Sequence, residues 1–134
     1  MLSKSGFATI MPIVNMKRAL KFYTEALGGT VVMEGQGDMK GWWSSVKIGT
    51  EEFWLVKPQK KEKRSLSYSV FIVDNIRKTV KELQGTGVKF EKAEKMSEKS
   101  RLEGPIAFEE FGASAFFKDS EGNLLMIWQN TMSG

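Results

Sequence analysis

The sequence predicts an α+β fold made of two tandem βαβββ modules, whose strands form a curved mixed sheet around a cleft. Two observations carry this prediction. Each half of the chain runs from an apolar, strand-like segment into a helix with a capping residue, and each half closes with a hairpin. A half of this size can cover only one face of its sheet with its helix, so the two remaining faces are expected to enclose the cleft.

The first module is predicted over residues 1–57. It begins with a strand at residues 7–14, which Pro12 places at an edge or a bulge. Asn15 is expected to cap a helix that ends at Gly28 and Gly29, because apolar residues recur between them at helical spacing. The remaining strands are predicted over residues 30–34, 42–48 and 52–57, the last two forming a hairpin around Gly49-Thr50.

The second module is predicted over residues 67–130. A strand at residues 67–73 leads into a helix capped by Asp74 or Asn75, and Gly85 and Gly87 end that helix. Further strands are predicted over residues 88–91, 113–118 and 124–129, while residues 92–105 form a polar stretch without an element. Residues 58–66 form a basic linker, so the 134 residues make one domain of two modules.

The residue types that are absent exclude several kinds of chemistry. The chain has neither Cys nor His, so it has no thiolate nucleophile, no serine–histidine triad and no zinc site of the usual composition. The net charge is +4, and much of it lies in the run from Lys57 to Arg64. That run lacks the interleaved aromatic residues of a single-strand binder, so a solvated linker is favoured over a nucleic-acid site.

Nothing in the sequence indicates export or a membrane. No apolar run of about 18 residues occurs, and the first residues lack a basic segment followed by an apolar core. We therefore expect a cytoplasmic protein with no membrane partner and no nucleic-acid partner.

Two segments resemble those of a known family. Residues 110–129 read E-F-G-A-S-A-F-F-K-D-S-E-G-N-L-L-M-I-W-Q, and residues 12–29 read P-I-V-N-M-K-R-A-L-K-F-Y-T-E-A-L-G-G. In this order and spacing they resemble the vicinal oxygen chelate superfamily, which includes glyoxalase I, extradiol dioxygenases, fosfomycin-resistance enzymes and bleomycin-resistance proteins. The closing turn is similar to the family's D-P-D-G-N, with Ser120 in place of the usual Pro. The resemblance covers nearly the whole chain.

The resemblance also implies where a metal would bind. Metal-dependent members place a His or Gln on the first strand of each half and a Glu on the last strand. The matching positions here are near Ala8 and Tyr68, at Met126, and at Phe53 or Trp54. None is a ligand of the usual kind, and a Met thioether is too soft for Mg, Mn or Fe(II). We therefore expect no metal, no cofactor and no catalytic residue of the family's usual type.

Without a metal, the cleft is predicted to be an apolar, aromatic-walled site for a flat organic molecule. Core packing is the competing interpretation for each aromatic residue, and Trp42-Trp43 argues best against it, because adjacent strand residues point to opposite faces. The pairs Glu51-Glu52 and Glu109-Glu110 are interpreted as exposed charge rather than acid–base groups. The candidate cleft residues are Trp42, Trp43, Phe53, Trp54, Tyr68, Phe108, Phe111, Met126 and Trp128.

The leading hypothesis is a metal-independent small-molecule-binding protein that sequesters an aromatic or apolar compound or an antibiotic. The alternative is a lyase or isomerase of the glyoxalase or epimerase type with a non-standard active site, and a weaker third is a regulatory or scaffold dimer without a ligand. The resemblance implies a homodimer. It also implies that binders of cationic bleomycin have acidic surroundings, and the net basic charge of this chain departs from that pattern.

Overall fold

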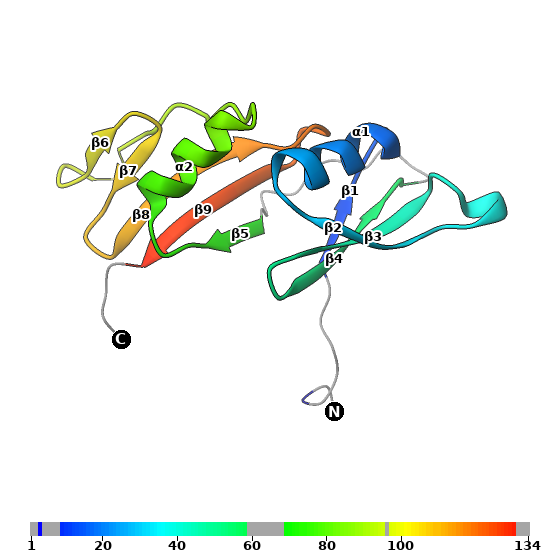
Figure 1. The fold of residues 1–134 in the computed structure, drawn as a ribbon. Coiled ribbons are helices and arrows are strands. Elements are labelled where there is room, and N and C mark those ends of the chain that lie inside the picture. Colours follow the sequence, from blue (N-terminus) through cyan, green and yellow to red (C-terminus); the bar gives the residue numbers. More distant parts are fainter. Residues whose placement is uncertain (1–2, 4–8, 59–68, 96, 131–134) are drawn as a thin grey trace. The chain divides into compact units, whose positions relative to one another are not determined.

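The computed structural model describes residue 3 and residues 9–58, 69–95 and 97–130. Its contacts divide the chain into two compact units, residues 1–63 and 64–134, each with its own sheet and helix (Figure 1). The expected basic linker falls largely on residues outside the described ranges. Within the described parts of the chain, no helix combines the length and the apolar composition that a membrane crossing requires.

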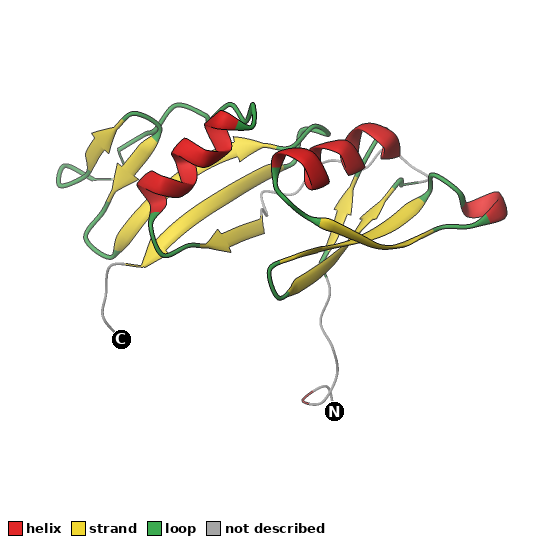
Figure 2. Cartoon of the chain, in the orientation of Figure 1, coloured by secondary structure: helices red, strands yellow, loops and turns green. Residues whose placement is uncertain are grey.

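The first unit has the predicted order of strand, helix and three strands (Figure 2). Its sheet has the order β1-β4-β3-β2, in which β1 runs parallel to β4 and the other pairs are antiparallel. The elements are β1 (Ile10–Pro12), α1 (Met16–Lys21), the π-helical turn η2 (Phe22–Ala26), β2 (Thr30–Glu34), the 3₁₀ turn η3 (Gly37–Met39), β3 (Trp43–Ile48) and β4 (Glu51–Val56).

Both helices begin at an asparagine that acts as the N-cap. Asn15 accepts a hydrogen bond from the Arg18 backbone N–H at 3.0 Å, and Asn75 accepts one from the Lys78 N–H at 3.1 Å. Each bond satisfies a donor that the first helical turn leaves without a partner. The predicted cap Asn15 is therefore confirmed, and Asn75 rather than Asp74 caps the second helix. At the far end of the first helix Gly28 takes a φ of 77°, which glycine adopts without strain.

The core of the first unit lies between α1–η2 and one face of the sheet. Tyr23 is fully buried, and its hydroxyl donates to the Met11 sulfur at 2.9 Å. Its ring packs edge-on against Phe53 with 5.3 Å between centroids. Val46 and Leu55 are buried on the same side. These contacts define the helix-covered face of the sheet.

The second unit pairs its strands in the order β5-β9-β8-β7-β6, with β5 parallel to β9 and the other pairs antiparallel. Its α2 packs against β8 and β9, where the buried side chains lie. The elements are β5 (Ser69–Ile72), α2 (Ile76–Gly85), β6 (Arg101–Glu103), β7 (Ile106–Phe108), β8 (Gly112–Lys118) and β9 (Leu124–Asn130).

The second unit departs from the prediction along the edge of β8. The strand predicted over residues 88–91 is reduced to one antiparallel bridge, Phe90 to Phe117, and a bond from the Glu91 N–H to the Phe116 carbonyl. The other end of β8 pairs with β7 instead, and β7 forms a hairpin with β6 inside the stretch expected to be without elements. Two short segments thus share the edge that one strand was expected to occupy.

The turn between β8 and β9 is held by one buried carboxylate. Asp119 accepts hydrogen bonds from the backbone N–H groups of Glu121, at 2.8 Å, and Asn123, at 2.7 Å, and from the Asn123 side-chain amide at 2.8 Å. Gly122 takes a φ of 83°, which this turn requires. The side chain of Asp119 therefore organises the closing hairpin.

Candidate functional site

The face of the first sheet opposite α1 carries a pair of tryptophans. Trp54 on β4 lies directly across from Ser45 on β3, and Trp43 lies two residues before Ser45, so all three side chains share this face. The two indoles are stacked, with 5.4 Å between centroids and 22° between planes. Trp54 is 39% exposed and Trp43 is half-buried. The pair presents flat apolar surface that the helix does not cover.

Ser45 lies in the sheet beside this pair and is 1% exposed. Its hydroxyl oxygen is buried and has no hydrogen-bond partner among the described residues. Leaving a buried hydroxyl unpaired costs about 1–3 kcal/mol. Ser45 is thus a polar group held at an energetic disadvantage on an otherwise apolar part of the face.

The strand registers of the two units show which residues correspond. Ile10 lies five residues before the cap Asn15 and pairs with Trp54, whereas Val70 lies five residues before the cap Asn75 and pairs with Met126. Trp54 is therefore the counterpart of Met126. The sequence had left the choice between Phe53 and Trp54 open, and the register decides it.

The corresponding face of the second sheet is also largely apolar. Met126 pairs with Phe116 on one side and Val70 on the other, so these three share the face opposite α2. Trp128 lies two residues beyond Met126, on the same face.

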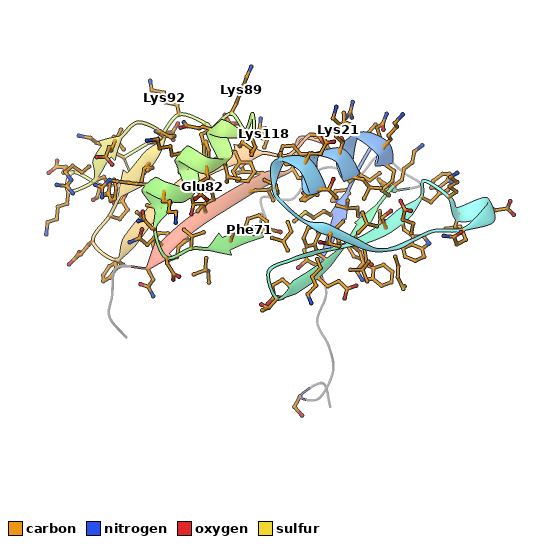
Figure 3. The ribbon with its side chains drawn as sticks, viewed as in Figure 1. Lys21, Phe71, Glu82, Lys89, Lys92 and Lys118 are labelled. Carbon is orange, nitrogen blue, oxygen red and sulfur yellow. The ribbon has the colours of Figure 1, made fainter. Side chains whose placement is uncertain are left out.

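Figure 3 shows Lys89 and Lys92 projecting outward on the side of α2, away from the sheet, and both are exposed.

Trp128 is fixed in place by a glycine. A Cβ on Gly112 would clash with the Trp128 ring and approach the Gln129 carbonyl oxygen to 2.6 Å, so only glycine lets the indole lie against β8. We expect Gly112→Ala to lower the free energy of unfolding by about 2 kcal/mol, because overpacking of this kind costs roughly 1–3 kcal/mol. The displaced ring should also shift the Trp128 indole N–H resonance.

Gly85→Ala is the matched control for that experiment. Gly85 is the last residue of α2, and a Cβ there would have nothing within 4 Å. The same substitution should therefore raise the free energy of unfolding, by about 0.5–1 kcal/mol, because it removes glycine's entropy cost. Urea denaturation of both variants measures the two effects, and equal stabilities would refute the steric argument at Gly112.

The other predicted site residues lie elsewhere. Phe53 is buried against Tyr23 on the helix-covered face, opposite to Trp54, because adjacent strand residues point to opposite sides. Phe108 lies under the Arg77 guanidinium of α2, 4.6 Å from its ring centroid, so it also faces the helix. These positions differ from the expectation of cleft-lining side chains.

Three further candidates stand apart from the stacked pair. Trp42 precedes β3 and its ring lies 5.1 Å from the Lys57 ammonium. Phe111 is exposed in the turn before β8. Tyr68 lies outside the described residues. Of the nine candidates, the structure thus brings Trp43 and Trp54 together on one face, and Met126 and Trp128 together on the corresponding face of the other unit.

Comparison with known proteins identifies the family. The sequence profile described as Glyoxalase/Bleomycin resistance protein/Dioxygenase superfamily matches residues 8–127. The chain belongs to this superfamily. No curated protein matches the sequence of this superfamily member.

Solved structures of the superfamily share the fold. A glyoxalase family protein from Enterococcus faecalis is 22% identical with a TM-score of 0.70, covering 96% of this chain and 99% of its own. The fosfomycin resistance protein FosX from Listeria monocytogenes is 12% identical with a TM-score of 0.67, covering 96% and 95%. A lactoylglutathione lyase from Agrobacterium tumefaciens is 14% identical with a TM-score of 0.67, covering 98% of each chain. These likenesses establish the fold alone.

Two of the positions at which the resemblance implies a metal ligand do not carry suitable donors here. The paired positions are Trp54 and Met126, an indole and a thioether, and neither is a ligand for an oxygen-preferring divalent ion. Within the described ranges, no group of three or more metal-binding side chains gathers where it could hold an ion. At these two positions, the residues present therefore do not fit the metal that the resemblance implies.

The carboxylates singled out in the sequence are mostly exposed. Glu51, Glu52 and Glu110 are exposed. Glu109 is partly buried, and one of its oxygens accepts a hydrogen bond from the Ser100 hydroxyl at 2.6 Å. This bond ties the segment before β6 to the end of β7, which indicates a structural role for Glu109.

Ser45 is the site residue that sequence reasoning missed. A serine in a strand gives no signal of its own, since Ser44 and Ser45 look equivalent in the sequence. Only the register separates them, because Ser44 pairs with Leu55 on the helix-covered face and Ser45 pairs with Trp54.

Proposed function

We propose that this superfamily member binds a flat aromatic or apolar organic molecule, without a metal, at the stacked Trp43–Trp54 pair. The observation that carries the proposal is the position of this pair on the sheet face opposite the helix, with Trp54 at the counterpart of Met126. Where metal-dependent relatives are expected to place a charged ligand, this chain presents ring surface. Ring surface binds planar molecules through apolar burial and stacking.

The exposure of the pair supports binding rather than core packing. A core tryptophan in a protein of this size would be covered, whereas 39% of Trp54 is open to solvent. Ile10, its parallel neighbour on β1, is exposed beside it. Together they form an apolar patch of the kind that marks ligand or partner sites. Sequestration of an aromatic compound, by a homodimer, is the role that best fits the resemblance to bleomycin-resistance proteins.

An enzymatic role of the glyoxalase or epimerase type has less support. Such a reaction needs a carboxylate, Lys or Tyr within hydrogen-bond reach of the substrate. One oxygen of the partly buried Glu109 accepts a hydrogen bond from Ser100, while Glu52 and Lys47 on the Trp54 face are both exposed. We therefore put binding ahead of catalysis.

The test is an NMR titration with acridine in the presence of EDTA, following the side-chain N–H resonances of the four tryptophans. We expect saturable shifts for Trp43 and Trp54 that EDTA leaves unchanged. Trp54→Leu should weaken acridine binding about tenfold or more, because truncating an aromatic anchor removes its stacking and burial.

Trp42→Leu is the matched control, since Trp42 is 37% exposed, nearly the same as Trp54, but stands outside the stacked pair. It should leave the acridine affinity within twofold of the wild type. Absence of any shift at Trp43 and Trp54, or a stoichiometric divalent ion in native mass spectra of the purified protein, would refute the proposal. The same spectra report whether the protein is a dimer.

A further inference from the structure

The unpaired hydroxyl of Ser45 has no role in holding the sheet together. Its oxygen is buried and makes no hydrogen bond within the described residues. On the same face, its neighbours along β3 are Trp43 and Lys47, and its neighbours across the sheet are Met33 on β2 and Trp54 on β4. Lys47 is exposed and makes no hydrogen bond to the hydroxyl.

We propose that Ser45 determines the ligand specificity of the tryptophan site by donating a hydrogen bond to a neutral acceptor atom on the edge of the bound ring. The ligand class is then a planar heteroaromatic or aryl carbonyl compound, with a ring nitrogen or carbonyl oxygen at its edge. This inference rests on the proposed function, because it assigns the polar contact to the same site.

The geometry requires the indole pair to open when the ligand enters. Ser45 is directly across from Trp54 and two residues from Trp43, so it forms part of the floor beneath both rings. The centroids of the two indole rings are 5.4 Å apart. A third ring inserted between them needs about 7 Å between the two indole planes, which is twice the contact distance of two carbon atoms. A ligand inserted between the indoles therefore exposes the floor and brings its own edge toward Ser45.

The chemistry of the floor favours an uncharged acceptor. Ser45 offers one hydroxyl, which can donate to a ring nitrogen or carbonyl. A carboxylate or phosphate would have to give up its water for this single bond, and burying a charge with so few partners is strongly unfavourable. A ring without an acceptor would leave the hydroxyl unpaired, as it is in the free protein. Sites of this kind discriminate against ligands that lack the polar atom.

The experiment compares two probes of the same shape, quinoline and naphthalene, which differ by a ring nitrogen. Binding is measured from the Trp43 and Trp54 side-chain N–H resonances, with the wild type and Ser45→Ala. Each affinity is divided by the probe's octanol–water partition coefficient, which corrects for the difference in hydrophobicity between the two probes. After this correction, we expect the wild type to bind quinoline about fivefold more tightly than naphthalene, the effect of one net hydrogen bond. In Ser45→Ala that preference should fall to about one.

Ser44→Ala is the control, because Ser44 is equally buried but pairs with Leu55 on the helix-covered face. It should keep the fivefold preference. Ser45→Cys, which is close in size, gives a second reading if Ser45→Ala folds poorly: its weak donor should reduce the preference to about twofold or less.

The outcomes separate this inference from the proposed function. A preference that is lost in Ser45→Ala, reduced in Ser45→Cys and kept in Ser44→Ala supports the inference. If both probes shift Trp43 and Trp54 but the preference survives Ser45→Ala, the specificity assignment is overturned while the binding site stands. If neither probe shifts these resonances in the wild type, the inference and the proposed function are both refuted.

Discussion

Tyr23→Ala is expected to lower the free energy of unfolding by about 3–5 kcal/mol, the usual cost of truncating a large core aromatic residue. Tyr23 is fully buried, contacts the Phe22 and Phe53 rings edge-on, and donates its hydroxyl to the Met11 sulfur. It fastens the helix to the first sheet, so the cavity left by its removal lies between two layers that cannot collapse onto each other. Urea denaturation, monitored by tryptophan fluorescence, measures the loss.

Tyr23→Phe separates the ring from the hydroxyl. The ring contacts remain and the bond to the soft Met11 sulfur is lost, so we expect a cost of about 1 kcal/mol or less. A Tyr23→Phe variant as unstable as Tyr23→Ala would show that the hydroxyl, and not the packing, holds the helix in place.

Asp119→Ala is expected to lower the free energy of unfolding by about 3 kcal/mol. The substitution removes the acceptor of hydrogen bonds from the backbone N–H groups of Glu121 and Asn123 and from the Asn123 side-chain amide. Hydrogen bonds to a charged acceptor contribute about 1.5–3 kcal/mol each but are not additive within one network. The closing hairpin brings β9 against β8, so the loss should appear in global unfolding of the second unit rather than in a local loop.

Two variants test the Asp119 prediction. Asp119→Asn keeps one acceptor oxygen for the backbone donors and should cost about half as much, since its amide cannot accept from the Asn123 side chain. Asp38→Ala removes the same charge from the exposed turn η3 and should change stability by less than about 0.5 kcal/mol. Equal losses at Asp119 and Asp38 would mean that net charge, and not the turn, is responsible.

The sequence predicted those parts of the fold whose determinants are local. Asn15 caps the first helix because its side chain accepts a hydrogen bond from the backbone N–H three residues later in the chain. A contact this local can be predicted from a few neighbouring residues. The segment around Phe90 and the hairpin β6–β7 were mispredicted because they compete for one edge of β8, and such competition depends on distant residues. Strands of three residues also leave no measurable alternation in the sequence.

The candidate site was predicted in composition but not in geometry. Aromatic enrichment indicated Trp43, Phe53 and Trp54 together, yet the register of β3 on β4 sends Phe53 to the core and brings the two tryptophans into contact. A shift of one residue would exchange those roles, and nothing within β4 alone fixes the register. The unpaired hydroxyl of Ser45 is a property of the assembled sheet, so no pattern in the sequence could have indicated it.

The parallel pairing of β1 with β4, and of β5 with β9, also governs how the protein is made. In each unit the strand that is synthesised last lies inside the sheet, between the strand synthesised first and its hairpin partner. On the ribosome, the first unit can therefore complete its sheet once Val56 has emerged. The second unit must hold α2 and its hairpins without their central strand until residue 130 has emerged, which exposes apolar surface to chaperones and to other nascent chains.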